Sequence, residues 1–197
     1  MFRNILFVIS ALFFVLSANQ AMAQATANTE CPVGLVNGMT LDDEFGPGTS
    51  EITHCLERRH DVKLVVQVNN FCGNTACTRP YGLHNIVNVI ADYEITNGMK
   101  LGIDYEIAVV VHSGGGTMML EPNPEDGSPA HPKAVDNKFA QNVKDLMAQG
   151  VKFYFCQNTV RGMGVKTSQI IKGVEYVTAG ISALADFQKQ GWTYVQP

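Results

Sequence analysis

Short apolar runs alternate with stretches of helical spacing along the chain from residue 61 onward. The runs are rich in β-branched and aromatic residues, which predicts buried strands over residues 63–69, 106–112, 151–156 and 174–177, and a closing strand over 192–195. Apolar residues between the runs recur every three or four positions, which predicts helices over residues 80–97, 139–150, 167–171 and 181–188. Because strands and helices alternate over short connections, the pattern predicts a single three-layer α/β domain with a mainly parallel sheet.

The segment before this domain has a different character. Residues 24–61 contain two prolines, four glycines and the acidic run Asp42–Glu44, without a sustained period. Such a segment is rich in turns, so we expect an irregular N-terminal extension that lies over the domain. The α/β domain itself is then predicted to span residues 62–197.

The first residues have the organisation of a secretory signal peptide. Arg3 supplies the positive charge, Ile5–Ala18 is an apolar run, and Ala21–Ala23 has the small-x-small pattern of a cleavage site. The run is shorter than the roughly 20 residues that a membrane-spanning helix needs. We therefore expect cleavage after residue 23 and export to the periplasm, with no membrane segment in the mature protein. An uncleaved membrane anchor is the alternative.

Composition narrows the class of protein. The 197 residues are 46% hydrophobic, enough for a sizeable core, and 16% charged, below the roughly 25% of typical globular proteins. This balance excludes disorder over most of the length. The formal net charge of −4 argues against a nucleic-acid partner, because such binding needs a basic surface.

All 5 cysteines follow the signal peptide: Cys31, Cys55, Cys72, Cys77 and Cys156. An exported protein keeps its disulfides, and an odd number of cysteines leaves at least one without a partner in the chain. The positions favour Cys31–Cys55 and Cys72–Cys77 bonds with Cys156 free, although spacing alone does not decide the pairing. A redox-active Cys72–Cys77 pair is an alternative to a purely structural bond.

Residues capable of chemistry follow three of the predicted strands. Asn69, Asn70 and Cys72 follow the first, His112 and three glycines end the second, and Cys156 ends the third. Because the carboxyl ends of parallel strands meet at one edge of a sheet, we expect these residues to converge on a ligand crevice.

Cys156 is the candidate nucleophile of this edge. Arg161, five positions further on in a loop bordered by glycine, would favour the thiolate by its charge, and the next helix would add its amide-rich N-terminus. Such a thiolate can attack sulfane sulfur and hold it as a persulfide. The alternative is an inert cysteine packed in the core, because free cysteine is among the most buried residue types.

His112 and the following glycines each have a functional and a structural interpretation. A histidine can orient a substrate or exchange a proton near neutral pH, or simply hydrogen-bond to the backbone. Gly114–Gly116 can present amides to an anion or form a tight turn. We expect no cofactor and no metal: position 119 is Met, which breaks the dinucleotide fingerprint, and no His-x-x-x-His pair exists.

Residues 155–163 contain the block Cys-x-Asn-Thr-x-Arg-Gly-Met, which resembles the DsrE/DsrF-like family and in particular its exported members. The similarity runs from about Lys63 to the C-terminus and includes Val111-His112, Lys172–Val177 and Gly191-Trp192. It implies a YchN-like fold related to flavodoxin, a homo-oligomer of trimer or hexamer type, and sulfur transfer through a persulfide on Cys156.

The chain also departs from the cytoplasmic members of this family. It carries a signal peptide, additional cysteines and a proline-rich insertion around Glu121–Pro132. An exported carrier would take sulfur from periplasmic sulfide, polysulfide or thiosulfate, and its physiological donor and acceptor are not identified by the sequence.

We therefore expect a sulfur carrier or sulfurtransferase with Cys156, Arg161 and His112 at its site. A non-catalytic oligomeric binding or accessory protein of the same fold is one alternative. A thiol–disulfide oxidoreductase that uses Cys72 and Cys77 is the other.

Overall fold

The structure is a computed structural model, and it describes residues 41–53 and 61–197. The predicted signal peptide, Cys31 and Cys55 lie outside these residues, so the predictions made for them stay predictions. In the described part of the chain, no helix is both long and apolar enough to cross a membrane.

A sheet of 5 parallel strands forms the centre of the domain, in the order β4-β3-β2-β1-β5. The strands are β1 (Val62–Val68), β2 (Tyr105–Val111), β3 (Lys152–Cys156), β4 (Glu175–Val177) and β5 (Thr193–Val195). The predicted α/β class and the predicted strands are confirmed. Because the central strands β1 and β2 are covered on both faces, their sequences are almost continuously apolar.

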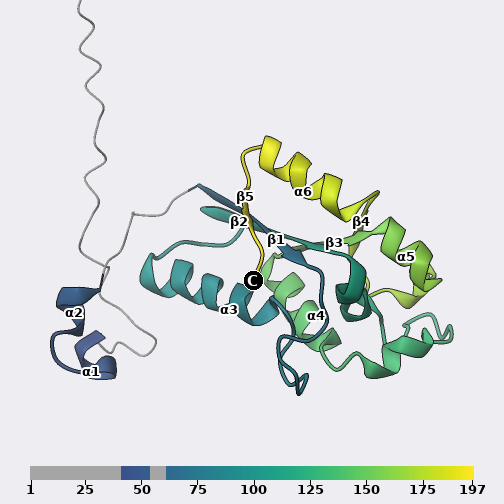
Figure 1. The fold of residues 1–197 in the computed structure, drawn as a ribbon, viewed down its shortest axis with the longest axis horizontal. Helices are drawn as coiled ribbons and strands as arrows, with labels where there is room; N and C mark the ends of the chain where they lie inside the picture. The colour runs from purple at the N-terminus through teal and green to yellow at the C-terminus, as the bar shows by residue number, and fades with distance from the viewer. Residues whose placement is uncertain (1–40, 54–60) are drawn as a thin grey trace, which may run out of the picture.

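Helices cover both faces of this sheet (Figure 1). They are α3 (Leu83–Ala91), which continues as the π-helix η2 (Asp92–Thr96), α4 (Ala140–Gln149), α5 (Gln157–Met163) and α6 (Gly180–Lys189). The helix α6 lies on one face, and α3 and α4 lie on the other (Figure 1). Short 3₁₀ helices complete the connections: η3 (Ser113–Met119), η4 (Pro132–Asp136) and η5 (Thr167–Gln169).

Alternation along the strands divides the core between these two layers. Leu64, Val66 and Val68 of β1 belong to the larger apolar cluster, with the buried side chains of α3 and α4. Val65 belongs to a smaller cluster with Leu184 of α6. Successive side chains of a strand point to opposite faces, so the position of each residue in its strand decides which helix it meets.

Three segments differ from the sequence-based expectation. The extension predicted as irregular contains two short helices, α1 (Leu41–Phe45) and α2 (Thr49–Ile52). The helix predicted over residues 167–171 is the single 3₁₀ turn η5. Residues 157–163, which we expected to be a loop, form α5. None of the residues of α5 is fully buried, and only Val160 and Met163 pack partly against the core, which is too little apolar surface to produce a clear helical period in the sequence.

Candidate functional site

The carboxyl ends of β2 and β3 lie side by side, and their last residues share an orientation. Val111 pairs with Phe155, and both side chains belong to the core on the α3 and α4 face. The residues that follow these two are His112, directly after β2, and Cys156, the last residue of β3, and both therefore point to the opposite face, where α6 lies. The expected convergence of these two residues is present in the structure.

Cys156 is a free cysteine that is only 4% exposed. Its sulfur accepts a hydrogen bond from the backbone N–H of Gly180, with 3.2 Å between N and Sγ. Gly180 is the first residue of α6, and Cys156 itself is the N-cap residue of α5. The sulfur therefore lies beside the starts of two helices, where unpaired N–H groups carry partial positive charge and favour an anion.

Two opposing effects decide the ionisation of Cys156. Burial raises the pKa of the thiol, because a thiolate loses its hydration. Interactions with the backbone and side chain of Thr159, and with the amides of Gly180 and Asn158, favour the thiolate and outweigh burial. The pKa of Cys156 therefore lies below its ordinary value, which is the property a nucleophilic cysteine needs.

Thr159 connects the sulfur to the end of β2. Its hydroxyl oxygen accepts a hydrogen bond from the N–H of Ser113, at 2.9 Å. Ser113 has a left-handed backbone with φ of 51°, which is uncommon outside glycine. The Thr159 methyl group lies against Gly116, where an added Cβ would come within 2.8 Å of it. The Thr159 side chain is therefore held from two sides.

His112 lies in a chain of polar side chains of which it and Gln67 are buried. Tyr194 donates a hydrogen bond to Oε1 of Gln67, and the Gln67 amide nitrogen lies 2.7 Å from His112 Nε2. Because Oε1 of Gln67 accepts from Tyr194, the Gln67 amide nitrogen donates to Nε2, and the ring proton of His112 is on Nδ1. The distance from Nδ1 to the Ser113 hydroxyl oxygen is 2.9 Å. Burial lowers the pKa of His112, so the imidazole is neutral near pH 7.

Gly180 joins His112 to Cys156. A Cβ on Gly180 would lie 2.9 Å from His112 Cδ2, so the imidazole packs directly on the backbone whose N–H binds the sulfur. His112 thus fixes the position of a thiolate donor. Whether His112 also exchanges a proton stays a prediction.

Arg161 lies on the exposed side of α5, and its guanidinium donates a hydrogen bond to Asn158 Oδ1 at 3.0 Å. The expectation that it stands in a loop is wrong, because α5 begins directly after Cys156. On a helix it lies five positions from the sulfur and more than one turn away along the axis. Its role at the thiolate stays a prediction.

The three glycines after His112 serve close packing. An added Cβ would lie 2.6 Å from the Val68 carbonyl oxygen at Gly115 and 2.7 Å from Met163 Sδ at Gly116. Both glycines are buried in η3. These contacts let η3 lie between the end of β1 and the helix α5.

Cys72 and Cys77 form a disulfide, as predicted from their spacing. The bond closes a small hairpin after β1, in which Cys72 pairs with Pro80 and the Gly73 N–H binds the Arg79 carbonyl at 2.8 Å. Both cysteines are half-buried, and the four residues between them are exposed. Within the described ranges, no group of three or more His, Cys, Asp or Glu side chains is placed to hold a metal.

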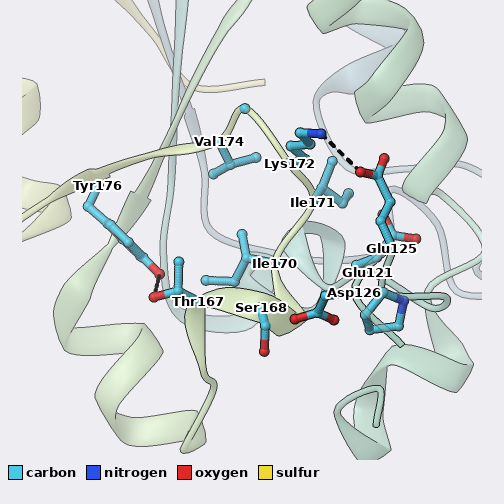
Figure 2. Close-up of a pocket in the computed structure, with 12 residues that line it drawn as sticks. Glu121, Glu125, Asp126, Thr167, Ser168, Ile170, Ile171, Lys172, Val174 and Tyr176 are labelled. Carbon is cyan, nitrogen blue, oxygen red and sulfur yellow. Dashed lines mark hydrogen bonds and ion pairs between the residues drawn. The ribbon is translucent and has the colours of Figure 1, made fainter. Parts of the chain in front are cut away.

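A cavity of about 310 Å³ lies elsewhere, between the proline-rich loop and the segment that leads into β4 (Figure 2). Ile170, Val174 and Tyr176 supply apolar surface, and the Lys172–Glu125 ion pair of 3.0 Å lies at its edge. Tyr176 pairs with Phe155 rather than with Cys156. The cavity therefore lies on the other side of the sheet from the cysteine.

Sequence reasoning missed Gly180, Gln67 and Tyr194. Gln67 did leave a signal, because it is a polar residue inside an apolar strand, and a buried amide needs partners. Gly180 and Tyr194 left none, since each depends on the packing of distant elements.

Comparison with known proteins identifies a family and similar structures for this domain. The sequence profile of the DsrE/DsrF-like family matches residues 61–197. A protein of unknown function, MTH1491 from Methanobacterium thermoautotrophicum, has a similar structure, with 24% identity and a TM-score of 0.53 over 70% of this chain and 100% of that one. The ychN protein from E. coli is 18% identical, with a TM-score of 0.47 over 69% of this chain and 99% of its own. A comparison with curated protein sequences finds no significant match.

Proposed function

The chain belongs to the DsrE/DsrF-like family, and on that premise we propose that it is a sulfur carrier that binds sulfane sulfur as a persulfide on Cys156. The observation that carries this proposal is the hydrogen bond from the Gly180 N–H to the sulfur of a free cysteine. A thiolate is the form of cysteine that reacts, and this donor favours it.

The proposed step is a nucleophilic displacement. The Cys156 thiolate attacks a sulfane sulfur of a polysulfide, a new S–S bond forms on Cys156, and one S–S bond of the donor breaks. The shortened polysulfide leaves with the electron pair. Because Cys156 is 4% exposed, small inorganic donors fit the site better than the persulfide of a large protein.

His112 and Arg161 complete the proposed site. The neutral imidazole holds Gly180 in place, and its Nδ1 proton lies on the side of Ser113. The Arg161 charge, exposed on α5, would attract anionic sulfur species toward the helix starts.

The test is the intact mass of the purified protein after incubation with polysulfide, under non-reducing conditions. We expect a gain of sulfur that is absent in Cys156→Ser and retained in Cys72→Ser/Cys77→Ser. No gain that depends on Cys156 would contradict the proposal.

Two other functions remain alternatives, each with an observation in its favour. The burial of Cys156 favours a binding or accessory protein in which this cysteine only packs. The Cys72–Cys77 disulfide is compatible with a thiol–disulfide oxidoreductase. If the protein is a binding or accessory protein, Cys156→Ala should change its stability and nothing else. If it is an oxidoreductase, its reduced Cys72 and Cys77 should reduce the disulfide of a substrate.

We further propose that the protein acts in the periplasm and as a homo-oligomer. Support comes from the signal-peptide pattern of residues 1–23 and from the assembly of trimers and hexamers that the family resemblance implies. Cleavage before Gln24 in the exported protein is the direct check of the first proposal.

A further inference from the structure

The Cys72–Cys77 disulfide lies at the same sheet edge as Cys156. Asn69 and Asn70, which lead into the hairpin, lie against Gly114, where an added Cβ would be 3.1 Å from the Asn69 carbonyl oxygen. The neighbouring Ser113 N–H binds Thr159, which contacts the Cys156 sulfur. The start of η3 therefore contacts both the residues that lead into the hairpin and the threonine next to the Cys156 sulfur.

This disulfide has the features of a bond that is easily reduced. It joins cysteines only five positions apart, so it constrains the unfolded chain little. Cys77 has a left-handed backbone with φ of 50°, a strained conformation for a residue other than glycine. The residues between the cysteines are exposed, so a small nucleophile can approach.

The hairpin is also positively charged. Arg79 is the only charged residue between Phe71 and Tyr81. A positive charge on the hairpin attracts an anionic nucleophile toward the disulfide. Hydrosulfide, one of the periplasmic sulfur sources expected for this carrier, is a small anion of this kind.

We propose that the Cys72–Cys77 disulfide oxidises hydrosulfide and thereby makes the sulfane sulfur that Cys156 binds. The inference rests on the function proposed for Cys156. It supplies the oxidant that such a carrier needs if its sulfur source is sulfide, because sulfide sulfur must lose two electrons before it can form a persulfide.

The chemistry balances in three displacements. Hydrosulfide attacks one sulfur of the disulfide, which gives a persulfide on one cysteine and a thiolate on the other. A second hydrosulfide attacks the outer persulfide sulfur, and the second cysteine leaves as a thiolate. The other product is H₂S₂, and it loses a proton to give HSS⁻. The Cys156 thiolate then attacks the protonated sulfur of HSS⁻, the S–S bond of HSS⁻ breaks, and the departing sulfide takes up the released proton to regenerate hydrosulfide. In sum, one sulfide sulfur loses two electrons, and the disulfide accepts them.

A small intermediate fits the burial of Cys156. The HSS⁻ anion can enter a site that is too enclosed for the hairpin itself, so no direct contact between the disulfide and Cys156 is needed. The sulfide route and the polysulfide route therefore end in the same Cys156 persulfide and differ only in their need for the disulfide.

The test uses full-length exported protein with its disulfides intact, in the absence of oxygen. Sodium hydrosulfide is added to one sample and polysulfide to another, and sulfur gain and new thiols are mapped by mass spectrometry. From hydrosulfide, we expect up to one sulfur on Cys156 and alkylatable thiols at Cys72 and Cys77. The variant Cys72→Ser/Cys77→Ser should gain at least tenfold less from hydrosulfide and as much as the wild type from polysulfide.

Variants that change the charge of Arg79 provide an independent experiment. Arg79→Gln should slow the reaction with hydrosulfide several-fold at low salt, while Arg79→Lys should keep the rate. Neither variant should change loading from polysulfide.

Two results would overturn the inference: a wild type that loads from polysulfide but not from hydrosulfide, or a double variant that loads from hydrosulfide as well as the wild type. A wild type that fails to load from polysulfide would contradict the function proposed for Cys156 instead. Opening of the disulfide by hydrosulfide would still be measurable in that case through its new thiols.

Discussion

At the scale of single residues, Cys156 is held by neutral groups rather than by a charged neighbour. The Gly180 N–H binds the sulfur, and Thr159 and Asn158 add interactions that favour its ionised form. These groups belong to the first turns of α5 and α6, so a small change in either turn alters the reactivity of the cysteine. Two substitutions test this directly.

Thr159→Val removes the hydroxyl but keeps the shape of the side chain. We expect a higher Cys156 pKa and a roughly tenfold slower alkylation at neutral pH, since a hydrogen bond to a charged group contributes about 1.5 kcal/mol or more. The pH dependence of alkylation measures this. Thr159→Ser, which keeps the hydroxyl, is the control and should alkylate at nearly the wild-type rate. An unchanged rate in Thr159→Val would show that the hydroxyl does not act on the sulfur.

Gly180→Ala tests the contact between His112 and the thiolate donor. The new methyl group would lie 2.9 Å from His112 Cδ2, so we expect a loss of about 1–3 kcal/mol in the free energy of unfolding and a higher Cys156 pKa. Gly162→Ala is the control, because a Cβ there meets no atom within 4 Å and replaces a glycine inside α5. Urea unfolding compares the two. Equal stability of both variants would refute the contact.

The residues of the site were only partly predictable. Cys156 and His112 could be found because each ends an apolar run, and the parallel topology then brings them together. The donor Gly180 could not, because a backbone N–H has no side-chain signature and its position depends on how α6 begins. The same holds for Tyr194, which reaches Gln67 only because β5 pairs with β1.

At the scale of elements, burial decided which parts of the fold were predictable. The helices α3, α4 and α6 each bury apolar residues at helical spacing, and all three were predicted. The helix α5 buries none, and its sequence therefore looked like a loop. Gly150 ends α4 with φ of 112°, which agrees with the predicted end of that helix.

The hairpin after β1 gives a prediction at this scale. Its disulfide closes a short loop, and loop-closure entropy predicts that Cys72→Ser/Cys77→Ser lowers the free energy of unfolding by only about 2 kcal/mol. Urea unfolding without reductant measures the difference. A much larger loss would mean that the bond is a structural necessity, which argues against its use as an oxidant.

At the scale of the whole molecule, the order β4-β3-β2-β1-β5 places β2 and β3 next to each other, and with them His112 and Cys156. The fold itself was predictable to this level from the alternation of strands and helices. The cavity beside Tyr176 was not, because it depends on how the proline-rich loop folds back onto η5.

The buried histidine makes stability depend on pH. The folded protein lowers the pKa of His112, so the unfolded chain binds the proton more readily. The stabilisation is present above the unfolded pKa of about 6.5 and is lost as the pH falls below it. We expect His112→Gln to flatten this part of the curve of unfolding free energy against pH, and His84→Gln, the same substitution at an exposed position, is the matched control. Identical slopes in wild type and His112→Gln would contradict the interpretation.

Assembly is the second property of the whole molecule that can be tested. We expect the mature protein to sediment as a trimer or a hexamer, as the family resemblance implies. Analytical ultracentrifugation at micromolar concentration decides this, and a monomer at all concentrations would count against the proposed homo-oligomer.

The most direct measurement of the central claim is the alkylation of Cys156 in the native, folded protein as a function of pH. Cys156 is identified by peptide mapping, and Cys72 and Cys77, which are not alkylated while their disulfide is intact, show that the protein has not been reduced. The account predicts that Cys156 reacts without unfolding, with a midpoint below the ordinary pKa of a cysteine. A cysteine that reacts only after denaturation, or with a midpoint at or above the ordinary pKa, would contradict it.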